Sequence, residues 1–108
     1  MTEPADAASA PPEQHPPAGA IVRVIPIVNS RGLHARAAAR FVLTVEKFDA
    51  AVTVTRGHET VGGTSIMGLL MLNAAPGTSI TVTAAGLQAA DVMTALEALV
   101  ADRFGEGE

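Results

Sequence analysis

One short stretch combines residue types that suit the chemistry of phosphate: Asn29-Ser30-Arg31-Gly32-Leu33-His34-Ala35-Arg36. A β-branched run ends just before it and an Ala-rich run begins within it, so we expect His34 at the start of a helix. A helix start leaves backbone N–H groups unpaired and carries partial positive charge, which together form an anion site. The same positive end disfavours a second positive charge, so we expect the imidazole to stay neutral and nucleophilic.

The neighbours of His34 fit a role in binding a transferred phosphoryl group. Arg36 and the unpaired amides would neutralise its oxygens, and phosphoryl transfer depends mostly on positioning and charge neutralisation. Gly32 would let the backbone bend tightly without a Cβ clash. The simpler alternative is that His34 is an exposed turn residue. We expect His15 to be a solvated residue of the N-terminal segment, and His58, at a hairpin tip, to be structural or solvated.

The elements that must position this stretch follow from hydrophobic periodicity. Strands are predicted at 20–28, 50–55, 59–63 and 79–84, with Gly57-His58 as a two-residue hairpin turn. Helices are predicted at 35–48, at 65–72 with Thr64 or Ser65 as its cap, and from Ala89 through Phe104. Pro26 cannot donate a ladder hydrogen bond, which places the first strand at a sheet edge. The order βαββαβα predicts a two-layer α/β (α+β) open-faced sandwich with three helices on one side of the sheet.

Composition limits the remaining possibilities. The chain has 108 residues, a net charge of −4 and no cysteine, which argues against nucleic-acid binding, disulfides and thiolate metal sites. Its longest apolar run, 66–72, is too short to span a bilayer, so we expect a cytoplasmic protein without membrane insertion. Residues 1–19 hold five of the seven prolines and are predicted to form a disordered tail before a single domain, 20–108.

Two motifs resemble a known family. The segment Gly32-Leu33-His34-Ala35-Arg36, followed by Ala38-Ala39-Arg40-Phe41-Val42, is similar to the active-site signature of the HPr family of histidine-containing phosphocarriers. The segment Thr64-Ser65-Ile66-Met67-Gly68-Leu69-Leu70-Met71-Leu72 resembles the family's second signature, around a regulatory serine. The resemblance extends from residue 20 to about 104 and includes the order of the elements.

This resemblance implies a role for His34. The histidine would accept a phosphoryl group on Nδ1 from Enzyme I, which phosphoenolpyruvate charges, and pass it to an EIIA-type acceptor in sugar uptake or regulation. Arg36 would stabilise the phosphoryl group. The protein would thus be a carrier and not a free-standing enzyme. The resemblance also implies an antiparallel four-stranded sheet in the order 1-4-2-3, which agrees with the edge position argued from Pro26.

One departure concerns the position after the arginine, where the family usually has proline and this chain has Ala37. Alanine adds a backbone N–H that proline lacks. We expect this donor either to supplement phosphate binding or to be used inside the helix, with a less rigid first turn as the cost.

The second motif carries two further expectations. Ser65 would cap its helix, and the resemblance implies that HPr kinase/phosphorylase could phosphorylate it. The resemblance also places Ile66, Met67 and Leu70 outward as an apolar docking patch, although core packing is the alternative for each. Arg31, Arg36 and Arg40 would surround this patch and meet acidic partners, with a solvated face as the alternative for Arg31 and Arg40.

Two other functions compete with the carrier. A regulatory, nitrogen-related HPr-like protein would act mainly by phosphorylation-dependent protein binding. An enzyme with His34 as general base would need an acid to orient the ring, and no acidic residue lies near His34 in sequence. No metal or cofactor is expected, and the chain is expected to be a monomer.

Overall fold

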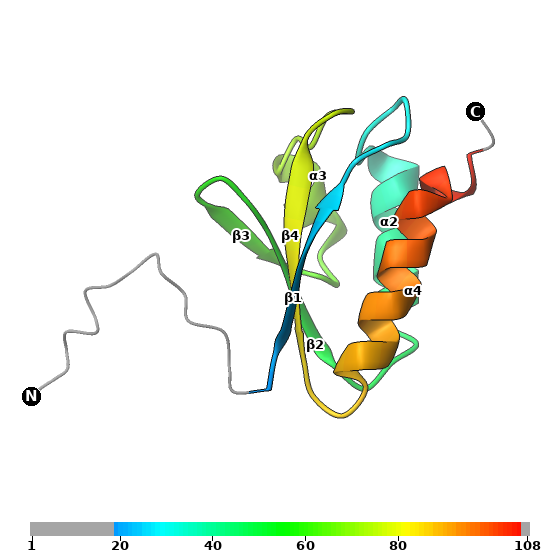
Figure 1. Ribbon diagram of the computed structural model, residues 1–108. Coiled ribbons are helices and arrows are strands. Elements are labelled where there is room, and N and C mark those ends of the chain that lie inside the picture. The colour runs from blue at the N-terminus through cyan, green and yellow to red at the C-terminus, as the bar shows by residue number, and fades with distance from the viewer. Residues whose placement is uncertain (1–18, 107–108) are drawn as a thin grey trace, which may run out of the picture.

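The structure, a computed structural model, describes residues 19–106, so the tail predicted at 1–19 and His15 fall outside the described residues except for Gly19. The described chain has the predicted order of elements (Figure 1). These are β1 (Ile21–Pro26), α2 (Ala35–Val45), β2 (Ala51–Arg56), β3 (Glu59–Gly62), α3 (Ile66–Met71), β4 (Ser79–Ala85), α4 (Ala89–Ala101) and the short 3-10 turn η1 (Arg103–Gly105).

The four strands form one antiparallel sheet in the order β1-β4-β2-β3, as expected. Pro26 lies on the edge strand β1 and pairs with Ser79 of β4, so the ladder loses no donor in its interior. The turn at Gly57 and His58 joins β2 to β3 as predicted, and both residues are exposed. The second edge is the short strand β3, also as predicted.

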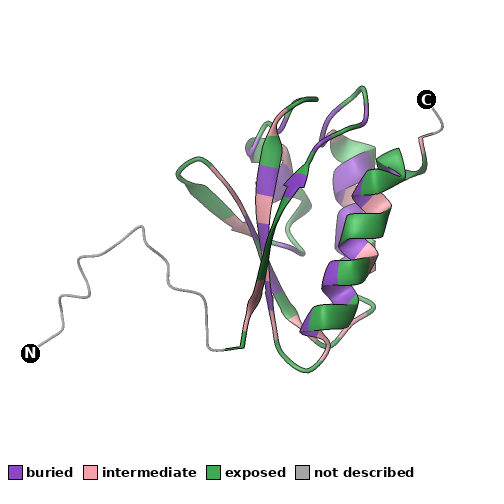
Figure 2. Cartoon of the chain, in the orientation of Figure 1, coloured by how far each residue is buried: buried purple, intermediate pink, exposed green. Residues whose placement is uncertain are grey.

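The helices lie on one side of the sheet, so the fold is the open-faced sandwich expected from the order of elements (Figure 1). Alternate residues of β2 and β4 are buried, and the buried sides of α2 and α4 face the sheet (Figure 2). The core is almost entirely aliphatic apart from Phe41 and Phe104. Its most deeply buried members, all with 0% exposure, include Ala38, Phe41, Val54, Leu69, Ile80, Val82, Val92, Leu96 and Phe104.

Two helix ends differ from the prediction. Helix α2 ends at Val45 and not at Phe48, because Lys47 and Phe48 donate to carbonyls three residues back and tighten the chain into a turn. Phe48 still packs against the core from that turn. Helix α4 ends at Ala101, and Phe104 enters the core from η1 with a left-handed backbone, φ +55°. Helical spacing thus identified both aromatic residues as inward-facing but misjudged the backbone that carries them.

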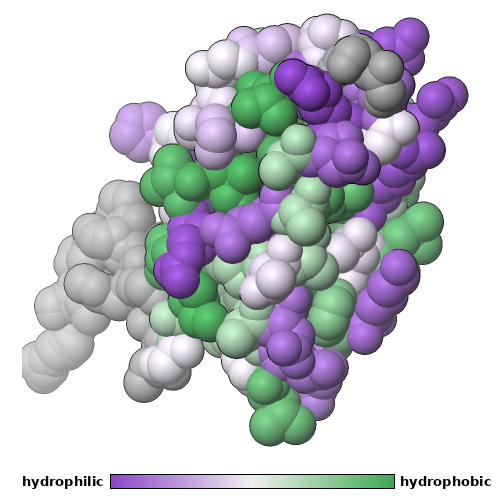
Figure 3. Space-filling model, turned by 45° about the vertical axis from the view of Figure 1, so that its right-hand side comes forward, coloured by the Kyte–Doolittle hydropathy of each residue, from purple (hydrophilic) through white to green (hydrophobic). Residues whose placement is uncertain are grey.

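The surface mixes apolar and polar side chains. On the face that Figure 3 shows, hydrophobic side chains lie in small groups separated by hydrophilic ones. Exposed apolar residues include Val22, Val24 and Val28 in and after β1. No helix in the part of the chain that the structure describes is long and apolar enough to cross a membrane.

Candidate functional site

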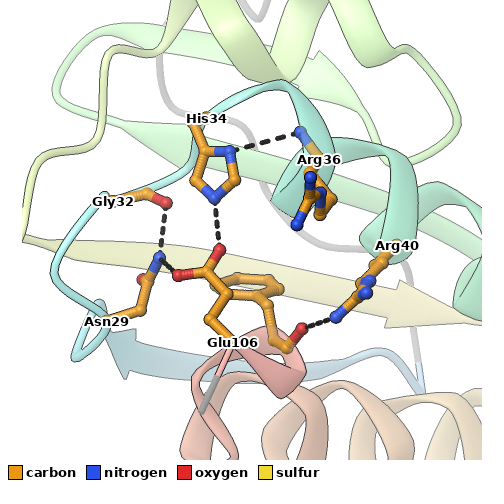
Figure 4. A network of polar contacts seen from close by, with 7 residues as sticks. Asn29, Gly32, His34, Arg36, Arg40 and Glu106 are labelled. Atoms are coloured by element: carbon orange, nitrogen blue, oxygen red, sulfur yellow. Dashed lines mark hydrogen bonds and ion pairs between the residues drawn. The ribbon is translucent and has the colours of Figure 1, made fainter. Parts of the chain in front are cut away.

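His34 is the N-cap residue of α2. Its backbone is extended, and its side-chain Nδ1 accepts a hydrogen bond from the backbone N–H of Arg36 at 3.3 Å. Ala38 donates to the His34 carbonyl at 2.8 Å, which is the first intrahelical bond. The imidazole therefore lies at the helix start with its Nδ1 lone pair directed at the helix amides (Figure 4). The side chain is 23% exposed and bonded at both nitrogens, so it is not simply a solvated turn residue.

The loop before His34 is fixed by a close approach of two backbones. Gly32 has φ +67°, and a Cβ built on it would lie 2.6 Å from the Ala74 carbonyl oxygen, so only glycine fits. The same carbonyl accepts the N–H of Leu33 at 2.9 Å. This confirms the expectation that Gly32 permits a tight bend, and it links the orientation of His34 to the loop that follows α3.

Asn29 supports the loop from beneath. It is fully buried, and its Nδ2 donates to the Gly32 carbonyl at 2.7 Å. A second Nδ2 bond, 3.1 Å long, reaches Oε1 of Glu106. Its Oδ1 is buried and has no hydrogen-bond partner among the described residues.

Glu106 supplies the acidic partner of His34 that the sequence did not indicate. Its Oε2 contacts Nε2 of the imidazole, although 72 positions separate the two residues (Figure 4). Burial raises the pKa of the Glu106 carboxyl, but hydrogen bonds from His34 and Asn29 and the charges of His34 and Arg31 outweigh it, so the pKa lies below its usual value of 4.5. The carboxyl is thus ionised at neutral pH, and its side chain is only 9% exposed.

An unusual backbone brings Glu106 to the site. Arg103, Phe104 and Gly105 all have positive φ, and for the two non-glycine residues this costs about 1 kcal/mol or more each. The buried Phe104 ring holds the segment in the core, and the Arg40 guanidinium donates to the Phe104 carbonyl (Figure 4). Arg40 is half-buried, and this hydrogen bond joins it to the C-terminal segment. Sequence reasoning did not foresee the contact.

The two other arginines lie on the open side of the site. Arg31 and Arg36 are exposed and line a cavity of about 340 Å³ together with Ser30, Gly105 and Glu106. Two arginines against one ionised carboxylate, Glu106, give the lining of this cavity a net positive charge, which favours an anionic occupant. The role of Arg36 in stabilising a phosphoryl group stays a prediction.

Ala37 occupies the third position of α2, one residue before the first intrahelical donor, which is Ala38. The residue is fully buried beneath the site. Whether its N–H binds a phosphoryl oxygen depends on the phosphorylated state, so its role stays a prediction that Ala37→Pro tests.

The second motif forms α3. Ser65 is the N-cap, as one of the two expected alternatives, and its Oγ accepts the N–H of Gly68 at 2.9 Å. Ile66 and Met67 are 42% and 68% exposed, Leu70 is half-buried and packs against the core, and Met71 adds a side chain that is 70% exposed. Leu69 and Leu72 are buried, as expected of core residues. An apolar surface therefore exists on α3 where the docking patch was predicted, with Leu70 only partly in it.

Sequence reasoning included Asn29 in the candidate stretch but gave it no role, and it missed Glu106. The polar Asn29 directly after an apolar strand was a weak local signal, whereas no pattern in the sequence points to Glu106. Among residues 19–106, no group of three or more His, Cys, Asp or Glu side chains could hold a metal ion.

Comparison with known proteins agrees with this geometry. Residues 21–102 match the family described as the PTS HPr component phosphorylation site. The chain is 48% identical over 84 residues to the phosphocarrier protein HPr of Neisseria meningitidis, covering 78% of this chain and 94% of that protein. It is 38% identical over 84 residues to the phosphocarrier protein NPr of Shewanella violacea, covering 78% and 92%.

Solved structures give the same result. An HPr from Thermoanaerobacter tengcongensis has a TM-score of 0.77 at 35% identity, covering 82% of this chain and 99% of that one. An HPr from Bacillus anthracis has a TM-score of 0.73 at 33% identity, covering 76% and 98%. With the paired motifs, the open-faced sandwich and the capping histidine, these matches show that the chain belongs to the HPr family of phosphocarrier proteins of the phosphotransferase system.

Proposed function

We propose that this phosphocarrier accepts its phosphoryl group on Nδ1 of His34 from Enzyme I and passes it to an EIIA-type protein. The observation that carries the proposal is the placement of Nδ1 at the start of α2, with its lone pair directed at the helix amides. The lone pair attacks phosphorus, an N–P bond forms, and the bond between phosphorus and the donor's leaving atom breaks with its electron pair. The carrier is regenerated when the N–P electron pair returns to the ring.

The transferred group would meet positive charge on arrival. The N–H of Arg36 already points at Nδ1, and Arg31 and Arg36 line the adjacent cavity. Helix-start amides and arginines stabilise phosphoryl oxygens without any further cofactor. The N–H of Ala37 is a third candidate donor on the same turn.

Partners would dock on α3 beside this site. Ile66, Met67 and Leu70 provide the apolar contact, while Arg31 and Arg40 are the expected basic residues around it, Arg40 with its guanidinium already bonded to the C-terminal segment. A methionine adapts its shape to several partners, which a carrier between two proteins requires. Acidic partner surfaces would complement the exposed arginines.

Ser65 is the candidate site of regulation by HPr kinase/phosphorylase. Its hydroxyl is exposed at the N-cap of α3, directly before Ile66 of the docking patch. A phosphate there would add about −2 charge and repel an acidic partner. Incubation with the kinase and ATP, followed by mass spectrometry, tests this assignment, and an unmodified Ser65 would count against it.

The decisive experiment mixes the full chain with Enzyme I and phosphoenolpyruvate and locates an acid-labile phosphate by mass spectrometry. We expect label on His34 in the wild type and none in His34→Ala, while the control His58→Ala, at the exposed hairpin turn, labels normally. Equal labelling of His34→Ala and wild type would overturn the proposal.

A regulatory role is the second candidate, because the relatives include a protein named NPr beside those named HPr. In that case the phosphorylation state of His34 would control binding to a regulatory partner instead of sugar uptake. Transfer assays with EIIA proteins of both branches separate the two. We further propose that the carrier acts in the cytoplasm as a monomer, which size-exclusion chromatography with light scattering tests.

A further inference from the structure

We propose that Glu106 is a positioning residue for phosphoryl transfer, which holds the proton on Nε2 of His34 throughout the cycle so that Nδ1 alone gains and loses phosphorus. The inference rests on the proposed function of His34 and deepens it. It gives the C-terminal segment 102–106 a part in the site.

The hydrogen bonds around the imidazole select one tautomer from both sides. An ionised carboxylate only accepts, so Nε2, which contacts Oε2 of Glu106, must carry the proton. A backbone N–H only donates, so Nδ1, which faces the Arg36 N–H at 3.3 Å, must present its lone pair. The nucleophilic nitrogen is thereby fixed as Nδ1 before any donor arrives.

Glu106 is itself held in place. Its second oxygen accepts from Nδ2 of the buried Asn29, at 3.1 Å, and the same nitrogen bonds the Gly32 carbonyl. Behind it, the buried Phe104 and the bond from Arg40 to the Phe104 carbonyl restrain a backbone that would otherwise relax from its left-handed conformation. A carboxylate restrained at both ends orients an imidazole as second-sphere carboxylates orient metal-binding histidines.

This arrangement has a consequence when the phosphoryl group is bound. Attack by Nδ1 forms the N–P bond while Nε2 keeps its proton, so the ring becomes cationic. The charged groups around the ring are Arg31 from the loop, Arg36 from α2 and Glu106 from the C-terminal segment. Of these only Glu106 favours the cation. When phosphorus leaves, the N–P electron pair returns to Nδ1 and the ring is neutral again, with no proton exchanged.

Loss of the Nε2 proton would instead leave a neutral ring on phosphorus, and this ring would have to leave as an imidazolate anion, which is slow. Glu106 would therefore keep the bound group transferable at higher pH than the two arginines alone would allow. Glu106→Gln retains an oxygen that accepts from Nε2 but removes the charge, whereas Glu106→Ala removes both. Comparison of the two variants separates orientation from charge stabilisation.

The first experiment measures the tautomer of the unphosphorylated full chain by ¹⁵N NMR of the histidine ring. We expect the Nε2–H tautomer in the wild type, mostly the same tautomer in Glu106→Gln, and a mixture in Glu106→Ala. Glu46→Gln, at the opposite end of α2, removes the same charge from an exposed position and serves as the control. A wild-type tautomer in Glu106→Ala would overturn the orienting role.

The second experiment charges each variant with Enzyme I and phosphoenolpyruvate and follows loss of phosphate from His34 against pH. In Glu106→Gln, unlike Glu46→Gln, we expect the alkaline fall in release rate about one pH unit lower, hence about tenfold slower release on that limb. Coincident profiles for wild type and Glu106→Gln would overturn the electrostatic role. No label on wild-type His34 would overturn the proposed function instead, and the NMR result does not depend on labelling.

Discussion

Replacement of Gly32 by alanine should destabilise the protein and displace His34. The residue has φ +67°, which costs an L-residue about 1–2 kcal/mol. The new Cβ would also lie 2.6 Å from the Ala74 carbonyl oxygen, a backbone atom that cannot move without stretching the 2.9 Å bond it accepts from Leu33. Loss of that bond adds about 1 kcal/mol. We therefore expect a loss of about 2–3 kcal/mol, or about 10–20 °C in Tm for a domain of this size.

Gly77→Ala is the matched control for this experiment. Gly77 has φ +88° in the turn after Pro76, but a Cβ there would meet nothing within 4 Å. Gly77→Ala should cost only the backbone term, about 1–2 kcal/mol or about 5–15 °C, without the lost hydrogen bond. Urea unfolding and calorimetry measure both variants, and histidine NMR reports whether His34 moves. Equal destabilisation by the two variants would refute the argument that the contact with Ala74, and not glycine's backbone freedom alone, fixes the loop.

Three further predictions concern α3 and the C-terminal segment. Ser65→Ala should lose about 1 kcal/mol because Oγ no longer accepts the Gly68 N–H, and unchanged urea unfolding would contradict the capping role. Leu69→Ala, at a site with 0% exposure, should lower the unfolding free energy by about 3 kcal/mol. Met67→Ala should stay within about 0.5 kcal/mol of the wild-type stability but should slow phosphoryl exchange with Enzyme I. A normal exchange rate in Met67→Ala would argue against docking at Met67. Because the pKa of Glu106 is lowered below 4.5, its contribution to stability is present above that pH and lost as pH falls through the folded-state pKa. The difference in unfolding free energy between wild type and Glu106→Gln should therefore shrink on acidification from about pH 6 to about pH 3, and a constant difference would contradict the ion pair.

The fold was largely predictable because its elements are local patterns. Alternating Val and Thr marked β2 and β4, and a single proline identified β1 as an edge strand. The errors lie at helix ends, where Phe48 and Phe104 keep helical spacing although the backbone has already left the helix. The spacing of apolar residues in the sequence predicts that an aromatic ring is buried. The residue at which a helix ends depends on which carbonyls the following turn can reach, and spacing does not show this.

The residues of the site likewise separate into those that local sequence indicates and those that it does not. The positions of His34 and Ser65 at helix starts were predictable because capping depends on residues adjacent in sequence, whereas anion binding by Arg36 stays a prediction. Glu106 was not predictable, because its approach to His34 requires left-handed backbone at Arg103 and Phe104, and neither residue type signals that conformation. The contact of Arg40 was not predictable for the same reason, since its partner is the Phe104 carbonyl that this bend presents.

The two ends of the described chain lie at different distances from His34, and this difference decides where a fusion can be attached. The chain enters β1 at the end of the strand opposite the loop that leads to α2 (Figure 1), whereas Glu106 is in contact with the imidazole of His34 (Figure 4). A fusion joined on the amino side of β1 should leave transfer rates intact, whereas one joined directly after Glu106 would crowd the entrance to the site. Recombinant carriers for kinetic work are therefore best tagged at the amino end.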